Sequence, residues 1–272
     1  MGQGVSRRPV AFRVDGVRLA GLWIEPERAA PGALPLVFLH EGLGSIAQWT
    51  SRGRDVPAEI AAATGCPALV YERQGFGASD PLDRPRADDY LYDEAWRVMP
   101  QVLDQAGIGR CIPIGHSDGG SIALMFAARH PERVAALVSE AAHVIVEDIT
   151  LVGIRAARDQ YAPPDSRLRA ALARYHGDKT EATFSGWADV WLRPGFAAMD
   201  MCPHLAGLTA PLLALQGADD EYGSPRQLEL IAAHVGGPVE TWLVPDCGHA
   251  PHFQAHDAVV PRIVDFVRRA VG

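Results

Sequence analysis

The chain has 272 residues, of which 48% are hydrophobic and 21% are charged, and its formal net charge is −8. This composition is typical of a globular protein and argues against disorder for the bulk of the chain. The acidic balance, with no run of Lys or Arg, argues against a nucleic-acid partner. No apolar stretch approaches the roughly 20 residues of a membrane-spanning helix, so no membrane span is expected.

Residues 1–10 lack an apolar signal core, and we therefore predict a cytoplasmic location. The cysteines are scattered, without the spacing of a zinc site or the density of a disulfide framework. Buried free thiols are expected at Cys66, Cys111, Cys202 and Cys247. The sequence leaves the oligomeric state open.

The first elements predict an antiparallel hairpin, because residues 9–15 and 17–24 are joined at Asp15-Gly16, a dipeptide typical of a two-residue turn. Short, nearly continuous apolar runs follow, which is the pattern of strands buried on both faces of a parallel sheet. These runs lie at 36–39, 68–71, 111–114 and 134–138. Helical patterns between them lie at 56–64, 90–106 and 121–130.

Residues 146–203 interrupt this alternation with helical patterns and no convincing strand. Beyond them the alternation resumes, with strands at 212–216 and 239–244 and helices at 225–234 and toward the end of the chain. The predicted fold class is therefore α/β, with a mostly parallel, doubly wound sheet, an antiparallel N-terminal hairpin and a helical insertion. The core comprises residues 1–145 and 204–272.

The strongest chemical signal is Gly115-His116-Ser117-Asp118-Gly119, which lies between a predicted strand and a predicted helix. It matches the G-x-S-x-G nucleophile elbow, in which a serine on a strained turn presents its hydroxyl at the edge of the sheet. The glycines are needed because side chains at these positions would collide with the neighbouring chain. Pro113 lies inside the preceding strand, where a local distortion is expected.

In this motif and in the order of its elements the chain resembles the α/β-hydrolase superfamily over nearly its whole length. The resemblance implies that residues 146–203 form a cap. It also implies that His249, in Asp246-Cys247-Gly248-His249, is the base that activates Ser117. His252 is the second choice for the base.

The acid implied by the family's G-x-x-D pattern is Asp220, in Gly217-Ala218-Asp219-Asp220. Its neighbour Asp219 is the alternative, and Glu140, after the strand that follows the nucleophile helix, is a further one. The chain order Ser117, Asp220, His249 is the order of the family.

A tetrahedral intermediate needs two N–H donors for its oxyanion. The backbone N–H of Asp118 is one. The other is expected from the loop after residue 39, at Gly42 or Leu43, where the sequence resembles the family's H-G-x loop but inserts Glu41. For Glu41, a role behind the site and a plain loop carboxylate stay open.

Phe184, Trp187 and Trp191 recur at helical spacing. They either pack the insertion on the core or form an apolar wall of the substrate pocket, to which Tyr161, Tyr222 and Phe253 are further candidates. His143 and Glu140 are expected near the same edge of the sheet. The predicted pocket residues are Glu41, His143, Trp187, Trp191 and Tyr222.

No cofactor or metal is expected, because His249, His252 and His256 lack the companions of a metal motif. The segment 72–80 contains G-x-G without the third glycine of a dinucleotide site, and it resembles instead the superfamily's structural R-x-G-x-G-x-S loop.

The predicted function is hydrolysis of a small-molecule carboxylic ester through a Ser-His-Asp triad. Relatives with the same triad act on the carbon–carbon bonds of ring-cleavage products or on lactones, and these are the nearest alternatives. A ligand receptor that retains the pocket is an alternative of another class. Dehalogenase and epoxide hydrolase chemistry is disfavoured, because both use a carboxylate nucleophile where Ser117 stands.

Overall fold

The computed structural model describes residues 4–271, which form an eight-stranded sheet in the order β1-β2-β4-β3-β5-β6-β7-β8. Strands β3 to β8 run parallel, and β2 is antiparallel to both β1 and β4. The strands are β1 Val5–Val14, β2 Val17–Pro26, β3 Leu36–Leu39, β4 Ala68–Tyr71, β5 Ile112–His116, β6 Leu137–Glu140, β7 Leu212–Gly217 and β8 Val239–Val244. The predicted fold class is confirmed.

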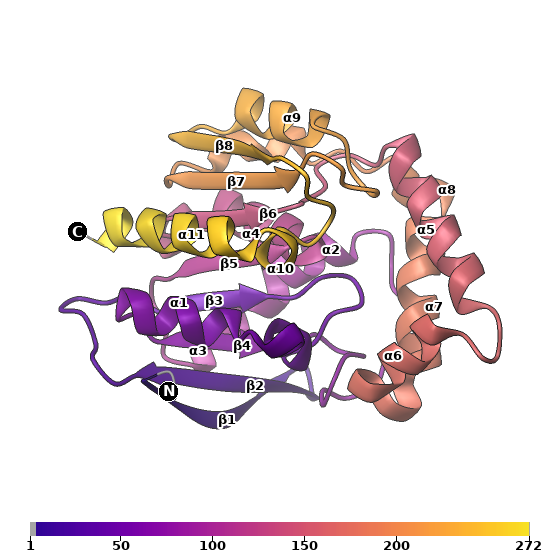
Figure 1. The fold of residues 1–272 in the computed structure, drawn as a ribbon, viewed down its shortest axis with the longest axis horizontal. Helices are drawn as coiled ribbons and strands as arrows, with labels where there is room; N and C mark the ends of the chain where they lie inside the picture. Colours follow the sequence, from indigo (N-terminus) through magenta and orange to yellow (C-terminus); the bar gives the residue numbers. More distant parts are fainter. Residues whose placement is uncertain (1–3, 272) are drawn as a thin grey trace.

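Helices cover both faces of this sheet (Figure 1). Apolar side chains of α1 (Val56–Thr64) and α11 (His256–Val271) pack in one core cluster. Those of α2 (Tyr90–Asp93), α3 (Met99–Gln105), α4 (Asp118–Arg129) and α9 (Arg226–His234) pack in the other. The inner strands β3 to β7 are therefore buried on both faces, as their near-continuous apolar sequences require.

The segment between β6 and β7 is helical, with α5 Asp148–Tyr161, α6 Arg167–His176, α7 Thr180–Trp191 and α8 Pro194–Ala197. Figure 1 shows these helices together beyond the carboxyl ends of the parallel strands. The short helix α10 (Pro251–Gln254) follows β8 at the same edge. The loops that follow the parallel strands therefore meet these helices at one side of the molecule. No helix in the described part of the chain is long and apolar enough to cross a bilayer.

Several expected boundaries differ from the structure. The helix predicted over 90–106 is interrupted by a π-helical turn, Glu94–Val98, and α4 begins at Asp118 rather than at 121. The strand expected at 134–138 is shifted to Leu137–Glu140, and Val134 only bridges Cys111. Pro113 stays inside β5, where pairing with β6 begins one residue later, at Ile114. The missing N–H of Pro113 therefore lies outside the β5–β6 ladder.

Candidate active site

Ser117 sits on a sharp turn between β5 and α4, with φ 54° and ψ −118°. A non-glycine residue rarely adopts this left-handed backbone, which costs on the order of 1–3 kcal/mol. The flanking glycines allow the turn, because a Cβ on Gly115 would lie 2.1 Å from the carbonyl oxygen of Gly119, and one on Gly119 would lie 2.0 Å from that of Leu39. The strand and the helix therefore approach each other closely enough to hold Ser117 at the edge of the sheet.

His249 and Asp220 reach Ser117 from the loops after β8 and β7. The Nε2 atom of His249 lies 2.9 Å from the Ser117 hydroxyl oxygen. Its Nδ1 atom lies 2.8 and 3.0 Å from the two carboxylate oxygens of Asp220. Asp220 is held in turn by the backbone N–H of Tyr222, at 2.8 Å. The structure thus brings together the three residues that were predicted as a triad.

The alternative residues lie elsewhere. Asp219 is exposed, and its backbone N–H bonds the carbonyl of Cys247. Glu140 contacts the buried His252, with Oε2 to Nδ1 at 2.8 Å, and not His249. His256 pairs with Glu59 at 2.8 Å.

The three C-terminal histidines therefore face three different carboxylates. Within residues 4–271, no group of His, Cys, Asp or Glu is arranged to hold a metal ion.

The pair of His249 and Asp220 has mutually shifted pKa values. Burial lowers the pKa of His249, but the hydrogen bond and charge of Asp220 outweigh burial and raise it above its ordinary value. Burial likewise raises the pKa of Asp220, but the hydrogen bond and charge of His249 bring it below its ordinary value. Both shifts favour an imidazolium beside a carboxylate, the charge state that a histidine general base passes through.

The residues that line the cavity at Ser117 include candidate backbone donors. The N–H groups of Gly42, Leu43 and Asp118 have no hydrogen-bond acceptor among the described residues, and all three residues line the same cavity as Ser117. Gly42 must be glycine, because a Cβ there would lie 2.3 Å from the indole Nε1 of Trp187. These three N–H groups are therefore the candidates for oxyanion donors.

A buried network behind these donors was missed by sequence reasoning. The carboxylate of Asp118 accepts a 2.6 Å hydrogen bond from the Tyr90 hydroxyl and a 3.4 Å contact from Arg73. Arg73 also donates to the backbone carbonyls of His40 and Glu41, at 2.6 and 2.8 Å. One guanidinium therefore connects the elbow to the loop after β3. Arg73 lies in the loop that resembles R-x-G-x-G-x-S, and this resemblance was the only feature of the sequence that pointed to the network.

The cavity at Ser117 has a volume of about 200 Å³. All five predicted pocket residues line it, namely Glu41, His143, Trp187, Trp191 and Tyr222. Lining residues that were not predicted are Gln48, Thr150, Ile154, Leu168 and Leu172, which carry no motif of their own. This volume is small for a ligand pocket.

Three aromatic candidates lie outside this cavity. Phe184 stacks on Tyr161, with ring centroids 3.7 Å apart and planes at 5°. Phe253 lies beside His252 at a separate, smaller cavity. The stacking of Phe184 matches the packing alternative, whereas Tyr161 and Phe253 do not line the cavity as the pocket-wall alternative expected. Glu140 is also absent from the lining, since it faces His252.

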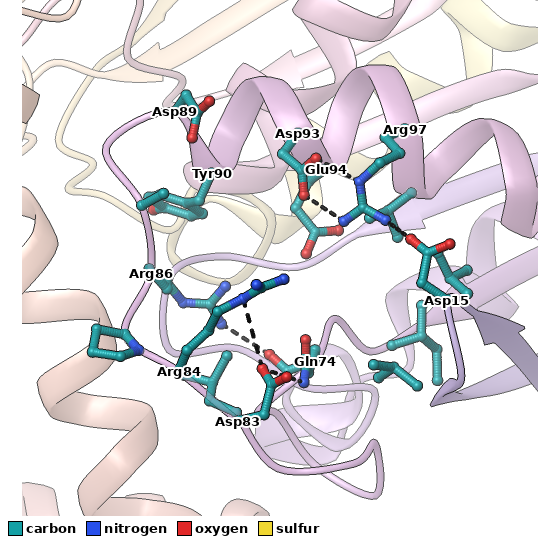
Figure 2. A pocket seen from close by; sticks show the side chains of 17 residues that line it. Asp15, Gln74, Asp83, Arg84, Arg86, Asp89, Tyr90, Asp93, Glu94 and Arg97 are labelled. Atoms are coloured by element: carbon teal, nitrogen blue, oxygen red, sulfur yellow. Dashed lines mark hydrogen bonds and ion pairs between the residues drawn. The ribbon is translucent and has the colours of Figure 1, made fainter.

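A second cavity, of about 620 Å³, is lined by Tyr90 among other residues (Figure 2) and shares no lining residue with the first. Its walls come from the β1–β2 turn and from residues 82–98. Figure 2 shows Arg97 bound to Asp93 and Asp15 at its rim, and Arg86 donating to the carbonyl of Gln74. Arg97 pairs with Asp15 and Asp93, and Arg84 with Asp83, while no serine, cysteine or histidine lines this cavity.

Known proteins resemble this chain in sequence and in fold. A family model described as alpha/beta hydrolase fold matches residues 35–163. A 2-hydroxy-6-oxononadienedioate/2-hydroxy-6-oxononatrienedioate hydrolase of Klebsiella pneumoniae is 24% identical over 262 residues, covering 88% of each chain. A putative carbamate hydrolase RutD of Variovorax paradoxus is 29% identical, covering 86% of this chain and 91% of the relative.

Solved structures show the same fold. The 2-hydroxy-6-oxo-6-phenylhexa-2,4-dienoate hydrolase of Rhodococcus sp. strain RHA1 superposes with a TM-score of 0.76 at 14% identity, covering 97% of this chain and 99% of that one. The enol-lactonase from Burkholderia xenovorans LB400 gives 0.69 at 20% identity, covering 95% and 99%. The chain therefore has the alpha/beta hydrolase fold, and the relatives that match most of its length are named as hydrolases.

Proposed function

We propose that the protein is a serine hydrolase that cleaves a carboxylic ester through an acyl-enzyme intermediate. The observation that carries this proposal is the continuous hydrogen-bond chain from Ser117 through His249 to Asp220, with links of 2.9 and 2.8 Å. A serine hydroxyl is a weak nucleophile until a neighbouring base takes its proton. These hydrogen bonds support His249 as that base and Asp220 as the acid behind it.

In the first half-reaction the Ser117 oxygen attacks the ester carbonyl while His249 takes the hydroxyl proton. Asp220 stabilises the imidazolium that results. The tetrahedral intermediate collapses when His249 returns the proton to the departing alcohol, which leaves an acyl group on Ser117. Water, deprotonated by His249, then attacks the acyl carbonyl, and the proton returns to Ser117 as the acid leaves.

The oxyanion of both intermediates is assigned to the N–H groups of Asp118 and of Gly42 or Leu43. Their lack of other acceptors supports this role. Such donors act most strongly in a cavity that excludes water. Residues 146–203 are proposed as the cap, since Thr150, Leu172 and Trp187 from this segment line the cavity at Ser117.

Carbon–carbon hydrolysis is the second candidate, because relatives such as the Klebsiella protein are named for it. Their names specify dienoate or dienedioate substrates, which are carboxylate anions. None of the residues lining the cavity here is Lys or Arg, and Glu41 adds a carboxylate. A substrate anion would meet no fixed positive charge, so a neutral ester or lactone is the better match. A ligand receptor that has kept the pocket and triad predicts slow turnover with tight ligand binding, so repeated turnover distinguishes an enzyme from it.

The test uses p-nitrophenyl esters of increasing acyl length, with Ser117→Ala as the control and a fluorophosphonate as a label. Repeated turnover of short esters is expected, with kcat lower by on the order of a thousandfold or more in Ser117→Ala. Labelling should occur at Ser117 and disappear in that variant. Absence of both turnover and labelling would contradict the proposal. Labelling with turnover only of dienoate substrates would favour carbon–carbon hydrolysis.

A further inference from the structure

Glu41 occupies a position where its charge acts on the reaction. It lies in the loop after β3, its side chain is 34% exposed, and it lines the same cavity as Ser117 and His249. Its carboxylate accepts no hydrogen bond from any described residue and has no Lys or Arg nitrogen within 4.0 Å. The resemblance to known hydrolases does not account for this residue, which interrupts the usual loop pattern.

The nearest basic group does not neutralise Glu41. The Nδ1 atom of His116 lies 3.9 Å from the carboxylate, while its Nε2–H donates to the carbonyl of His249 at 2.7 Å. Burial and the neighbouring His252 lower the pKa of His116 to about 4, so the ring is neutral at physiological pH. His143, which also lines the cavity, has its pKa lowered by burial and by His249. Both rings therefore leave the carboxylate uncompensated.

Arg73 does not supply the missing charge either. Its guanidinium contacts the carboxylate of Asp118 and two backbone carbonyls, and its side chain is buried. Glu41 lies between the cavity at Ser117 and the smaller cavity beside Phe253, and no described Lys or Arg balances its carboxylate in either. A partly buried charge that no neighbouring cation balances discriminates between ligands of opposite sign, although solvent reduces the effect.

Aromatic rings line the same cavity. Trp187, Trp191 and Tyr222 line it, and the Trp187 and Tyr222 rings meet edge to face with centroids 6.5 Å apart. The indole edge of Trp187 lies against Gly42, the residue next to Glu41. Aromatic faces attract cations, and tryptophan does so most strongly. A carboxylate beside such rings is a suitable environment for an ammonium group.

We propose that the preferred substrates are esters that carry a positive charge, with an ammonium group bound between the Glu41 carboxylate and the rings of Trp187 and Tyr222. This inference rests on the proposed ester hydrolysis and adds the charge of the substrate to it. It also accounts for Glu41 as a specificity residue. The anionic substrates named for the relatives should be turned over poorly.

The experiment compares substrates that differ in charge but hardly in shape. The first pair is acetylthiocholine and its neutral isostere, in which a tert-butyl group replaces the trimethylammonium group, and it places the charge on the leaving group. The second pair places the same two groups at the end of the acyl chain of a p-nitrophenyl ester. Each kcat/KM is divided by the rate of alkaline hydrolysis of the same ester, which removes differences in intrinsic reactivity.

We expect the wild-type protein to prefer the cationic member of at least one pair by about tenfold, mainly through KM. Glu41→Gln keeps the shape of the side chain and should reduce that preference to within about twofold. Asp219→Asn removes an exposed carboxylate outside the cavity and should leave the preference unchanged.

Equal use of cationic and neutral esters by the wild type would overturn the inference, as would a preference that persists in Glu41→Gln. Either result would leave ester hydrolysis intact, because the neutral esters are still cleaved. Loss of turnover on every ester, together with no fluorophosphonate labelling, would instead contradict the proposed function. The failures of the two proposals are therefore distinguishable.

Discussion

The hydroxyl of Tyr90 lies 2.6 Å from the carboxylate of Asp118, the residue that directly follows Ser117. Both side chains are buried, and the Tyr90 oxygen itself accepts a hydrogen bond from the indole of Trp191 at 3.0 Å. A helix on one face of the sheet is thereby connected to the nucleophile turn and to a helix between β6 and β7. The side chain of Asp118 thus takes part in a buried hydrogen-bond network, in addition to the role proposed for its backbone N–H.

Tyr90→Phe should therefore destabilise the protein. Removing the hydroxyl leaves the buried Asp118 carboxylate with Arg73 alone, and an unsatisfied buried group costs about 1–3 kcal/mol. The free energy of unfolding in urea measures this loss. Tyr92→Phe is the matched control, because the Tyr92 hydroxyl makes only a 3.2 Å bond to a backbone carbonyl in a partly exposed setting. An equal loss in the two variants would contradict the importance of the buried network.

The acid of the proposed triad is tested by Asp220→Asn. An amide in place of the carboxylate no longer stabilises the imidazolium, and kcat should fall by on the order of a thousandfold or more. Asp219→Asn, at the adjacent exposed position, should change kcat by less than about twofold. Steady-state turnover of a neutral p-nitrophenyl ester measures both. A large loss of kcat in Asp219→Asn, without one in Asp220→Asn, would identify Asp219 as the acid instead.

The pH dependence of kcat/KM follows from His249. The neutral imidazole accepts the Ser117 proton, so the rate should rise with pH through the pKa of His249, which Asp220 raises above the ordinary histidine value despite burial. Glu41 contributes to the same increase. Glu41→Gln should therefore move the midpoint of the acidic limb to lower pH on a neutral ester. An unchanged midpoint would show that the charge of Glu41 does not affect the pKa of His249.

Gly42→Ala should reduce kcat by about tenfold or more. The added Cβ would fall 2.3 Å from Trp187 Nε1, so that either the indole or the loop with its proposed oxyanion donor must shift. Replacing Trp187 by a smaller residue removes the obstacle. A double-mutant cycle of Gly42→Ala with Trp187→Leu should accordingly show a coupling energy of about 1 kcal/mol or more in kcat/KM. Additive effects would contradict a steric cause.

Local sequence signals predicted the parts of the fold that depend on local backbone geometry. Asp15-Gly16 predicted the hairpin because both residues adopt positive φ, at 52° and 87°. The glycines around Ser117 predicted the elbow for a different reason, because a Cβ on Gly115 or Gly119 would collide with a backbone carbonyl. Asp220 and His249 were found through a family pattern in loops that follow neighbouring strands, and the structure places both within hydrogen-bond distance of each other.

Contacts between distant segments were not predictable from such signals. Tyr90 has no motif around it, and its partner Asp118 was considered only for its backbone. Phe184 and Trp187 share a helix face, yet one stacks on Tyr161 and the other lines the cavity. Which side of a helix meets a neighbouring helix, and which meets a cavity, depends on how the helices cross. Helical spacing alone carries no information on that crossing.

Arg73 links the two chain segments that hold the candidate oxyanion donors, one after β3 and one after β5. Its position is determined when the sheet and its loops assemble, before any substrate is present. The candidate N–H donors are therefore already oriented when negative charge develops on the substrate oxygen. Water molecules would have to reorient at that moment, whereas in the protein the cost of orienting the dipoles is met during folding. A substitution that loosens Arg73 should consequently leave the nucleophile labelled but slow its chemistry, and so separate the reactivity of the serine from the rate of turnover.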